Sequence, residues 1–585
     1  MLAGAGTHGW ISGAASRGWM LGGAARACFL TLAFVFAGML TALPAHAAAF
    51  LVNIRVDASK PQGELKPIFR FFGADEPNYA TMKDGRKLLK ELGELAPGKV
   101  YFRAHSLLVT GDGTPALKWG STNAYTEDAS GNPVYDWTIV DHIFDTYLAR
   151  GIRPYAQVGF MPQALSLRPE PYQHSWRPGF PYDLISGGWA YPPKDYSRWA
   201  ELVYRWALHC VERYGRAEVE RWYWEIWNEP NGPAYWKGTP EEFYKLHDYA
   251  IDAIRRALPT ARVGGPDVAG SGGAFMEGFL DHVVSGTNYA TGQTGTPTDF
   301  LAFHAKGQPE FVGGHVRMGI AAQLRGIDKG FGMIAARPAL KAKPIVIGES
   351  DPDGCAACQG PQLGYRNGTM YSSYTAASFA RKHDLADKHG VNLEGALTWA
   401  FEFEDQPYFA GFRQLASNGL DLAVLNVFRM FKIMDGQRVT AASDAQIPMD
   451  EIIASGVRGK ADVGTLASYS KGKLAVLVWH YHDDDVAGDD AQVSLALTGL
   501  PKSLARGGSA KVTHYRIDDA HSNVYTAWKR MGSPLAPNDK QYAELDAADG
   551  LQALDAPQAL KLTRGGAKLE FTLPRQAVSL VVIEG

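Results

Sequence analysis

The sequence has few charged residues and few cysteines. Charged side chains make up 20% of its 585 residues and hydrophobic side chains 46%, a balance that excludes an intrinsically disordered chain. The sequence contains no basic stripe and no nucleic-acid-binding motif, which excludes nucleic acid as a partner. Beyond the first 47 residues, no apolar run is long enough to cross a membrane. A chain of this length can form a large barrel and a second domain.

Four cysteines occur, and Cys28 falls in the segment that we predict below to be removed. Cys210, Cys355 and Cys358 remain, which is an odd number for an exported protein. The sequence CAAC at 355–358 is compatible with a redox pair, half of a metal site or a local disulfide. It lacks both a second Cys/His pair at zinc spacing and a thioredoxin-like context, which favours a Cys355–Cys358 disulfide and no metal site. Cys210 lies on an apolar helical face and is expected to be buried.

The first 47 residues have the features of an export signal. Arg17 and Arg26 are their only charges, the apolar run CFLTLAFVFAGML follows Arg26, and Ala45 and Ala47 occupy the small-residue positions of a cleavage site. A membrane anchor is the alternative, but the apolar run is short for a span. We therefore expect a periplasmic or secreted protein that has no stable membrane insertion once residues 1–47 are removed.

Residues 70–435 alternate short apolar runs with amphipathic stretches. WYWEIWN (222–228) and PIVIGES (344–350) are typical of buried strands, and DYSRWAELVYRWALHCVERYG (195–215) is typical of a helix. Eight such strand–helix alternations predict an α/β fold, and eight parallel strands close a (β/α)8 TIM barrel.

Residues 436–585 change to short alternating strands and turns, such as LAVLVWHYH (474–482), and predict an accessory β-sandwich domain. Residues 48–69 contain the strand FLVNIRVDA (50–58) with no helix after it, and we expect this strand to join the sandwich.

Two glutamates stand at predicted strand ends. Glu229 follows the aromatic-rich strand in WYWEIWNEPNG (222–232), and Glu349 ends the strand in PIVIGES. A barrel brings strand ends together at one face, and two facing carboxylates can cleave a glycosidic bond, one as proton donor and one as nucleophile. Either glutamate alone could instead pair with Arg103 or cap a helix. Both positions together, with Asn228 beside Glu229 to bind a sugar hydroxyl, favour Glu229 as acid/base and Glu349 as nucleophile.

Other polar residues at the predicted strand ends are Asp75, Glu76, Arg103, His105, Asp267, His304, Lys306, Glu402, Glu404 and Asp405.

Several longer motifs resemble one enzyme family. They include YFRAHSLL (101–108), WEIWNEPN (224–231), DFLAFHAKG (299–307), VLNVFRMF (424–431) and THYRIDDAHSNVYTAWKRMGSP (513–534). In this order they resemble glycoside hydrolase family 39, which contains β-xylosidases and α-L-iduronidases, and the resemblance covers roughly residues 50–584. It implies a retaining exo-glycosidase that uses no cofactor, with Glu229 as acid/base and Glu349 as nucleophile.

The resemblance also implies a sugar pocket formed by His105, Phe160, Asn228, His304 and Trp399. For the two histidines a satisfied place in the core is the alternative, and Trp399 could simply roof the barrel. The sequence departs from the family's xylosidases at three points. The segment GESDPDGCAACQGPQ (348–362) follows the nucleophile, Glu404 and Asp405 are the nearest candidates for an acidic pair that grips sugar hydroxyls, and Lys306 stands where an aromatic or hydroxyl group is usual.

The leading hypothesis is an exported retaining β-xylosidase that acts on an oligosaccharide or polysaccharide substrate. Within the same family, the alternatives cleave an α-L-iduronide, an α-L-arabinofuranoside or a bacterial exopolysaccharide, and Lys306 would suit an acidic sugar. A non-catalytic carbohydrate-binding protein is the alternative from another class, but such a protein has no use for two facing glutamates. The sequence predicts no oligomeric state.

Overall fold

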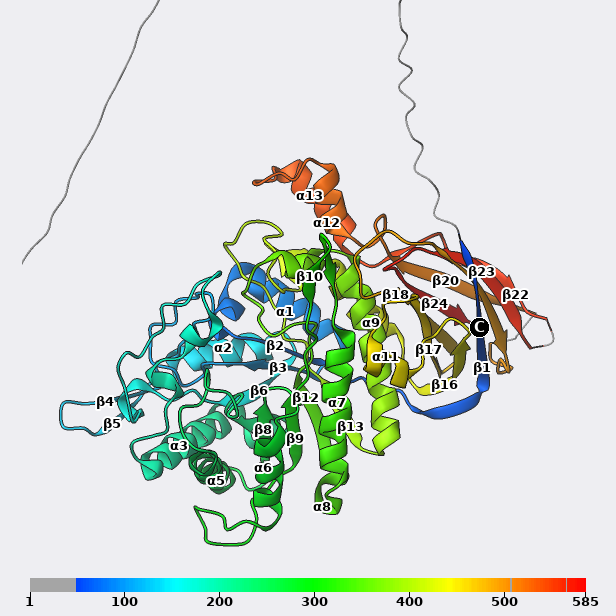
Figure 1. Ribbon diagram of the computed structural model, residues 1–585. Helices are drawn as coiled ribbons and strands as arrows, with labels where there is room; N and C mark the ends of the chain where they lie inside the picture. Colours follow the sequence, from blue (N-terminus) through cyan, green and yellow to red (C-terminus); the bar gives the residue numbers. More distant parts are fainter. Residues whose placement is uncertain (1–48, 505–507, 564) are drawn as a thin grey trace, which may run out of the picture. The chain divides into compact units, whose positions relative to one another are not determined.

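A computed structural model describes residues 49–504, 508–563 and 565–585 (Figure 1). The predicted export signal, residues 1–47, lies outside the described residues. Among the helices of the described part, none combines the length and the apolar character that a membrane span needs.

In the described part of the chain, eight parallel strands form a barrel and follow one another around it in sequence order. These strands are β2 (Phe71–Ala74), β3 (Val100–Ala104), β6 (Ile152–Val158), β7 (Tyr223–Ile226), β8 (Arg262–Val268), β9 (Phe300–His304), β12 (Pro344–Glu349) and β13 (Asn392–Ala396). The backbone N–H of Thr398 donates to Phe71 (3.0 Å) and the N–H of Gly73 donates to Thr398 (3.1 Å), which joins the last strand to the first. The predicted (β/α)8 barrel is confirmed.

Each barrel strand is followed by a helix that packs on its outer side (Figure 1). These helices are α1 (Lys83–Leu95), α2 (Thr138–Leu148), α3 (Tyr196–Tyr214), α5 (Pro240–Ala257), α6 (Gly273–Ser285), α7 (Ile320–Ala335), α9 (Thr369–His389) and α10 (Ala423–Ile433). Helix α5 shows why they begin where they do: Thr239 and Glu242 form a capping box, and Pro240 occupies the first turn. Strands β3, β7 and β9 are buried along their whole length, as parallel strands covered by helices must be.

Short elements interrupt the loops of the barrel. They are the hairpins β4 (Tyr125–Glu127) with β5 (Pro133–Tyr135), β10 (Glu310–Val312) with β11 (His315–Arg317) and β14 (Ala416–Ser417) with β15 (Leu420–Asp421), the helices α4 (Arg216–Val219) and α8 (Pro338–Lys341), and the 3-10 turns η1 (Pro77–Thr81), η2 (Gln163–Leu165), η3 (Tyr182–Ile185), η4 (Gly188–Ala190) and η5 (Pro361–Asn367).

Within residues 49–504, 508–563 and 565–585, ten further strands form a second sheet. They are β1 (Phe50–Glu64), β16 (Gln437–Ser443), β17 (Asp462–Ser470), β18 (Lys473–Tyr481), β19 (Ala491–Thr498), β20 (Ser509–Ile517), β21 (Gln552–Ala553), β22 (Gln558–Lys561), β23 (Ala567–Leu573) and β24 (Val578–Glu584). Helix α11 (Met449–Ser455) lies between β16 and β17, and α12 (Val524–Arg530) and α13 (Asp539–Asp549) lie between β20 and β21. The N-terminal strand β1 pairs with β16 on one side and with β19 on the other.

The second domain differs in one respect from a sandwich of two separate sheets. Its strands are connected by hydrogen bonds in one path, from β21 through β18 and β1 to β23. The sheet curls so that its two ends face each other, because the rings of His514 on β20 and Phe571 on β23 are 4.7 Å apart. Alternate side chains point into the space between the two ends and form a separate apolar core.

A buried ion pair connects the barrel to the second sheet. Arg381 on α9 lies 3.0 Å from Asp462 on β17, and both side chains are buried. Asp462 also accepts hydrogen bonds from the backbone N–H of Ile447 (2.7 Å) and from the indole N–H of Trp479 (2.8 Å). The carboxylate is thus satisfied on both oxygens at the point where the two domains meet.

We expect Asp462→Ala to lower the free energy of unfolding by about 3–5 kcal/mol, because it leaves the buried Arg381 without its charged partner. Denaturant unfolding followed by circular dichroism measures the change. Lys388→Ala is the matched control, since its pair with Asp328 is partly exposed and should cost less than about 1 kcal/mol. Equal losses in the two variants would contradict a special role for the buried pair.

Candidate active site

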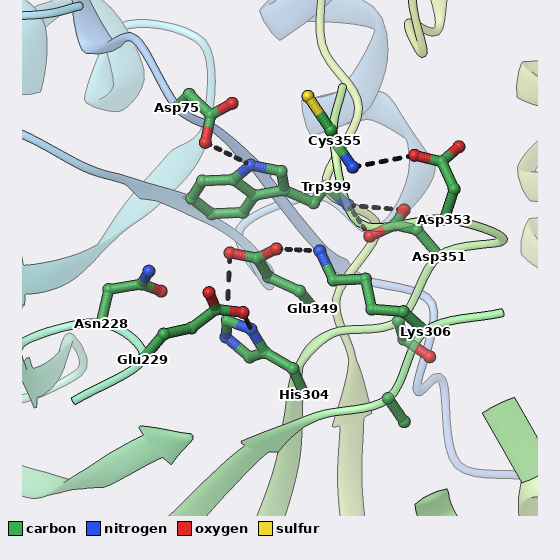
Figure 2. A network of polar contacts seen from close by, with 12 residues as sticks. Asp75, Asn228, Glu229, His304, Lys306, Glu349, Asp351, Asp353, Cys355 and Trp399 are labelled. Carbon is green, nitrogen blue, oxygen red and sulfur yellow. Dashed lines mark hydrogen bonds and ion pairs between the residues drawn. The ribbon is translucent and has the colours of Figure 1, made fainter. Parts of the chain in front are cut away.

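The two glutamates predicted to act together lie at the carboxyl ends of β7 and β12. Glu349 is the last residue of β12, and Glu229 follows β7 after a short turn. A carboxyl oxygen of each glutamate and a ring nitrogen of His304 lie within 4.8 Å of one another (Figure 2). Glu229 has a left-handed backbone (φ 45°), and its N–H donates to the carbonyl of Asp267 (2.9 Å), which fixes the direction of its side chain.

His304, the last residue of β9, connects Glu229 to Asp267. Its Nδ1 lies 2.7 Å from Glu229 Oε1, and its Nε2 lies 2.9 Å from Asp267 Oδ2. Burial alone would lower the pKa of His304, but the carboxylates of Asp267 and Glu349 raise this pKa to about 10. The imidazole is therefore protonated at neutral pH and donates a proton to the Glu229 hydrogen bond.

Glu349 is surrounded by positive charge. Lys306 Nζ pairs with its Oε2, and Arg103 Nη1 lies 3.3 Å from its Oε1. Burial favours the neutral acid, but the charges of His304, Lys306 and Arg103 outweigh burial and hold the pKa of Glu349 well below its usual range. Glu349 is thus ionised at neutral pH, as a nucleophile must be.

Arg103 connects four polar side chains, one of which is Glu349. Besides Glu349, it contacts Glu225 Oε2 (2.5 Å), Asn228 Oδ1 (2.8 Å) and Asp267. Because Asn228 accepts this hydrogen bond through its oxygen, its Nδ2 is left as a donor, and this nitrogen has no partner among the described residues. The sequence placed Arg103 and Asp267 at strand ends but did not assign them to the site.

Aromatic rings form the wall next to Glu349. The ring of His105 lies 4.4 Å from the ring of Trp399 and 5.4 Å from that of Phe160. Burial, together with the charge of Arg103, lowers the pKa of His105 to about 3, so this imidazole is neutral. The ring of Trp399 packs directly against the backbone of Gly73 on β2. Any larger residue at this position would collide with it, since an added Cβ would lie only 2.5 Å from the ring.

A small cavity opens beside these rings. Six of the side chains that line it belong to Asp75, His105, Lys118, Phe160, Trp189 and Tyr235. His105 connects the cavity to the glutamates, since its Nε2 lies 3.7 Å from Glu349 Oε1. Lys118 was missed by the sequence, because it lies within a long loop after β3 that has no strand-end pattern to identify it.

The structure does not support Glu404 and Asp405 as sugar ligands. Glu404 Oε2 accepts hydrogen bonds from the backbone N–H groups of Asp84 (2.9 Å) and Gly85 (3.2 Å), so its carboxylate caps the start of α1. Asp405 is exposed. Glu404 therefore caps a helix here, and its residue type alone does not distinguish capping from sugar binding.

Cys355 and Cys358 are joined by a disulfide, with their Cα atoms 5.4 Å apart. Cys210 is free and buried. The guanidinium of Arg366 donates to the carbonyls of Cys355 (2.6 Å), Ala356 (3.2 Å) and Cys358 (2.7 Å), and so holds the disulfide loop from inside.

An Arg–Asp–Arg chain connects this loop to the aromatic wall. Arg366 pairs with Asp353 (2.8 Å), Asp353 pairs with Arg413 (2.6 Å), and Arg413 Nε donates to the backbone carbonyl of Trp399 (3.1 Å). Asp351 accepts from the backbone N–H of Trp399 (3.0 Å; Figure 2). The loop after β12 thus positions Trp399.

Glu229, His304 and Glu349 offer three ligand atoms within 4.8 Å of one another, which is the spacing of a metal site. Each of the three already has protein partners, because Lys306 and Arg103 pair with Glu349, and His304 contacts Glu229 and Asp267. The arrangement suits a neutral, hydroxyl-bearing substrate held against one ionised carboxylate.

Comparisons with known proteins agree with this chemistry. The family model Glycosyl hydrolases family 39 matches residues 52–563. A β-xylosidase of Geobacillus stearothermophilus is 24% identical over 469 residues, which are 78% of this chain and 82% of the relative. An α-L-iduronidase of Mus musculus is 25% identical over 421 residues, which are 66% of this chain and 61% of the relative. The crystal structure of a monomeric β-xylosidase from Caulobacter crescentus CB15 has the same fold, with a TM-score of 0.70 at 22% identity over 91% of this chain and 99% of that one.

We expect Cys355→Ser to raise the Michaelis constant for a chromogenic glycoside several-fold while the melting temperature changes little. The bond closes a ring of only a few residues, so it restricts the unfolded chain weakly, and Arg366 still holds the loop carbonyls. Steady-state kinetics and calorimetry, with and without reductant, measure both quantities. Two free thiols in the native chain by mass spectrometry would contradict the disulfide.

Proposed function

Because the chain belongs to glycosyl hydrolase family 39, we propose that it is a retaining exo-β-xylosidase that releases xylose from the non-reducing ends of oligosaccharides. The chain is a glycoside hydrolase, and carbohydrates are its substrates. What we propose beyond this is that the sugar is xylose, that hydrolysis retains the anomeric configuration, and that Glu229 and Glu349 carry out the reaction.

One observation, the distance between the two carboxyl groups, supports a retaining mechanism. The carboxyl oxygens of Glu229 and Glu349 approach within 4.8 Å, whereas inverting enzymes keep their carboxyl groups about 6.5–9.5 Å apart to admit a water molecule. A separation this short leaves no room for water between the carboxylate and the sugar. Glu349 must then attack the anomeric carbon itself.

The two steps divide the chemistry between the glutamates. In the first step, Glu349 forms a bond to the anomeric carbon, the glycosidic bond breaks, and Glu229 gives its proton to the leaving oxygen. In the second, Glu229 takes a proton from water, the water oxygen bonds to the anomeric carbon, and Glu349 leaves as a carboxylate. His304 occupies Glu229 Oε1 through its Nδ1–H, which leaves Oε2 to carry the transferred proton.

The surroundings stabilise the charge that develops in both steps. Arg103 and Lys306 stabilise Glu349 as a carboxylate, which makes it a better leaving group in the second step. The Nδ2 of Asn228 is placed to donate to the 2-hydroxyl, an interaction that strengthens as the sugar becomes oxocarbenium-like.

The charge around the cavity favours a neutral sugar. Rings of Phe160, Trp189 and Tyr235 line the cavity. The cations beside it have carboxylate partners: Lys118 pairs with Asp75, and Lys306 pairs with Glu349. A neutral glycone fits this balance of charges.

A second candidate substrate, an α-L-iduronide, is favoured by one observation. Arg413 lies close enough to Lys306 for their charges to repel, and its Nη2 has no hydrogen-bond partner among the described residues. A sugar carboxylate could pair with both cations. A panel of chromogenic xylosides, iduronides, arabinofuranosides, glucosides and galactosides separates the two candidates by kcat/KM.

We also propose export to the periplasm or the medium. The export signal predicted over residues 1–47 supports this location, and the Cys355–Cys358 disulfide is of the kind that persists in oxidising compartments. Fractionation of the native host, with immunodetection of the mature chain, tests the proposal.

We expect Glu229→Gln to lower kcat/KM by about 10²–10⁴-fold for substrates with a poor leaving group, the usual contribution of a general acid/base. Glu349→Gln should remove activity entirely, because no other group can form the glycosyl intermediate. Glu277→Gln, on the exposed side of α6, is the control and should be unchanged. Azide added to Glu349→Gly should restore turnover with inverted configuration, and a Glu349 variant with near-normal activity would contradict the assignment.

We expect Lys306→Met to shift the acid limb of the pH profile of kcat/KM upward. Glu349 must be ionised to attack, and Lys306 is one of the charges that lower its pKa. Loss of that charge raises the pKa of Glu349, so activity is lost at a higher pH as the solution is acidified, while activity above the new pKa is retained. Lys237→Met, which is exposed, should leave the limb in place. An unmoved acid limb in Lys306→Met would show that this lysine does not control the nucleophile.

A further inference from the structure

Two charged side chains, Asp75 and Lys118, line the cavity beside His105. His105 Nε2 lies 3.7 Å from Glu349 Oε1 and 3.4 Å from Asp75 Oδ1, so both carboxylates approach the same imidazole nitrogen. Asp75 in turn pairs with Lys118 Nζ at 2.6 Å. If the anomeric carbon lies at Glu349, this spacing places Asp75 and Lys118 at the opposite edge of a sugar ring.

The backbone of Lys118 is held in a conformation that lysine rarely adopts. Its φ of 60° lies in the left-handed region, which is unfavourable for a residue with a long side chain. Its N–H donates to Glu76 Oε1, and its carbonyl accepts from His174 Nε2 (2.7 Å). Strained residues fixed on both sides in this way cluster at functional sites.

The side chain of Lys118 is buried, although an apolar residue would close the cavity without removing a charge from water. Asp75 compensates the ammonium group, and the hydroxyl of Tyr182 accepts a second hydrogen bond (3.2 Å). An ammonium group has three N–H donors. Among the residues that the structure describes, Nζ has these two acceptors, which leaves one donor for a ligand.

Asp75 completes a donor–acceptor pair at the cavity surface. Its Oδ1 accepts from the indole of Trp399 (3.1 Å; Figure 2). Its Oδ2 accepts from Lys118, and each carboxylate oxygen can accept a further hydrogen bond. A free donor on Lys118 next to a free acceptor site on Asp75 matches a hydroxyl group, which donates and accepts at once.

We propose that Lys118 and Asp75 bind the hydroxyl at the non-reducing end of the glycone, the 4-hydroxyl of a xylopyranose, and that Lys118 closes the cavity there and enforces exo action. This inference rests on the proposed function. The closure involves the loops after β3, β6 and β7, which carry Lys118, Tyr182 and Tyr235. The Tyr182 hydroxyl accepts from Lys118 and forms a hydrogen bond of 2.8 Å with the hydroxyl of Tyr235. A chain extended from the 4-hydroxyl would have to displace this barrier.

A double-mutant cycle between Lys118 and the substrate hydroxyl tests the inference. Nitrophenyl β-D-xyloside and its 4-deoxy analogue are assayed with the wild type, Lys118→Met and Lys118→Arg. In the wild type, loss of the 4-hydroxyl should lower kcat/KM by about 10–100-fold, because it leaves buried polar groups unpaired. In Lys118→Met the same loss should cost less than about threefold, and Lys118→Arg should restore part of the difference.

Lys194→Met is the matched control, because Lys194 also pairs with a carboxylate, Glu127, but lies on the surface. It should keep the full 4-deoxy penalty. A xylotriose that carries a 4-O-methyl group on its terminal sugar should resist the wild type and be cleaved by Lys118→Ala. Circular dichroism confirms that each variant is folded.

Several outcomes would overturn the inference. A 4-deoxy penalty of the same size in the wild type and Lys118→Met would show that Lys118 only supports the loop, and a wild-type enzyme indifferent to the 4-hydroxyl would exclude contact with it. Should the wild type prefer another glycoside, the xylose assignment fails, and the same cycle is run with that glycoside and its 4-deoxy form. Should it hydrolyse none, the proposed function fails, and calorimetric titration of xylose and 4-deoxyxylose into the wild type and Lys118→Met decides whether Lys118 binds the hydroxyl.

Discussion

The buried guanidinium of Arg103 is the interaction on which the site depends. It comes from β3 and contacts residues of β7, β8 and β12, namely Glu225, Asp267 and Glu349, and also Asn228. Its side chain is fully buried, so its charge is tolerated only because carboxylates surround it. Burial raises the pKa of Glu225 to about 8, whereas the charge of Arg103 helps to hold the pKa values of Asp267 and Glu349 below their usual range. An arginine suits this position because its planar group directs several N–H donors at once and stays charged whatever the pH.

The same arrangement gives the two histidines different protonation states. His304 lies between Asp267 and Glu349, which raise its pKa to about 10, whereas burial and the charge of Arg103 lower the pKa of His105 to about 3. A protonated His304 can orient Glu229, and a neutral His105 can form a wall beside the sugar without adding charge. The difference comes from neighbours and not from burial, because both imidazoles are buried. Residue type alone therefore could not have assigned these roles.

The sequence predicted the barrel and its two glutamates because both depend on local patterns. Strand periodicity marks where β7 and β12 end, and a closed barrel must bring those ends together. The sequence did not predict that Glu404 contacts the start of α1, because a carboxylate after a strand can cap a helix as readily as it can bind a sugar. Lys118 carries no pattern, since a long loop brings it to Asp75. The sequence also did not predict that the second sheet is continuous. Its continuity depends on the pairing of β1 with β16 and β19, which lie far along the chain.

Trp399 shows how these separate features produce one pocket. Its carbonyl is held by Arg413, its N–H by Asp351 and its indole nitrogen by Asp75. Arg413 continues through Asp353 and Arg366 to the disulfide loop, and Asp75 continues to Lys118. The ring is thus fixed from both sides by buried charged groups that are paired before any substrate arrives. A wall positioned in this way needs no reorganisation on binding, so interactions with the sugar can be used to favour the transition state. The charged pairs around the wall therefore serve its geometry, because they hold the ring of Trp399 in place from the disulfide loop on one side and from Asp75 on the other.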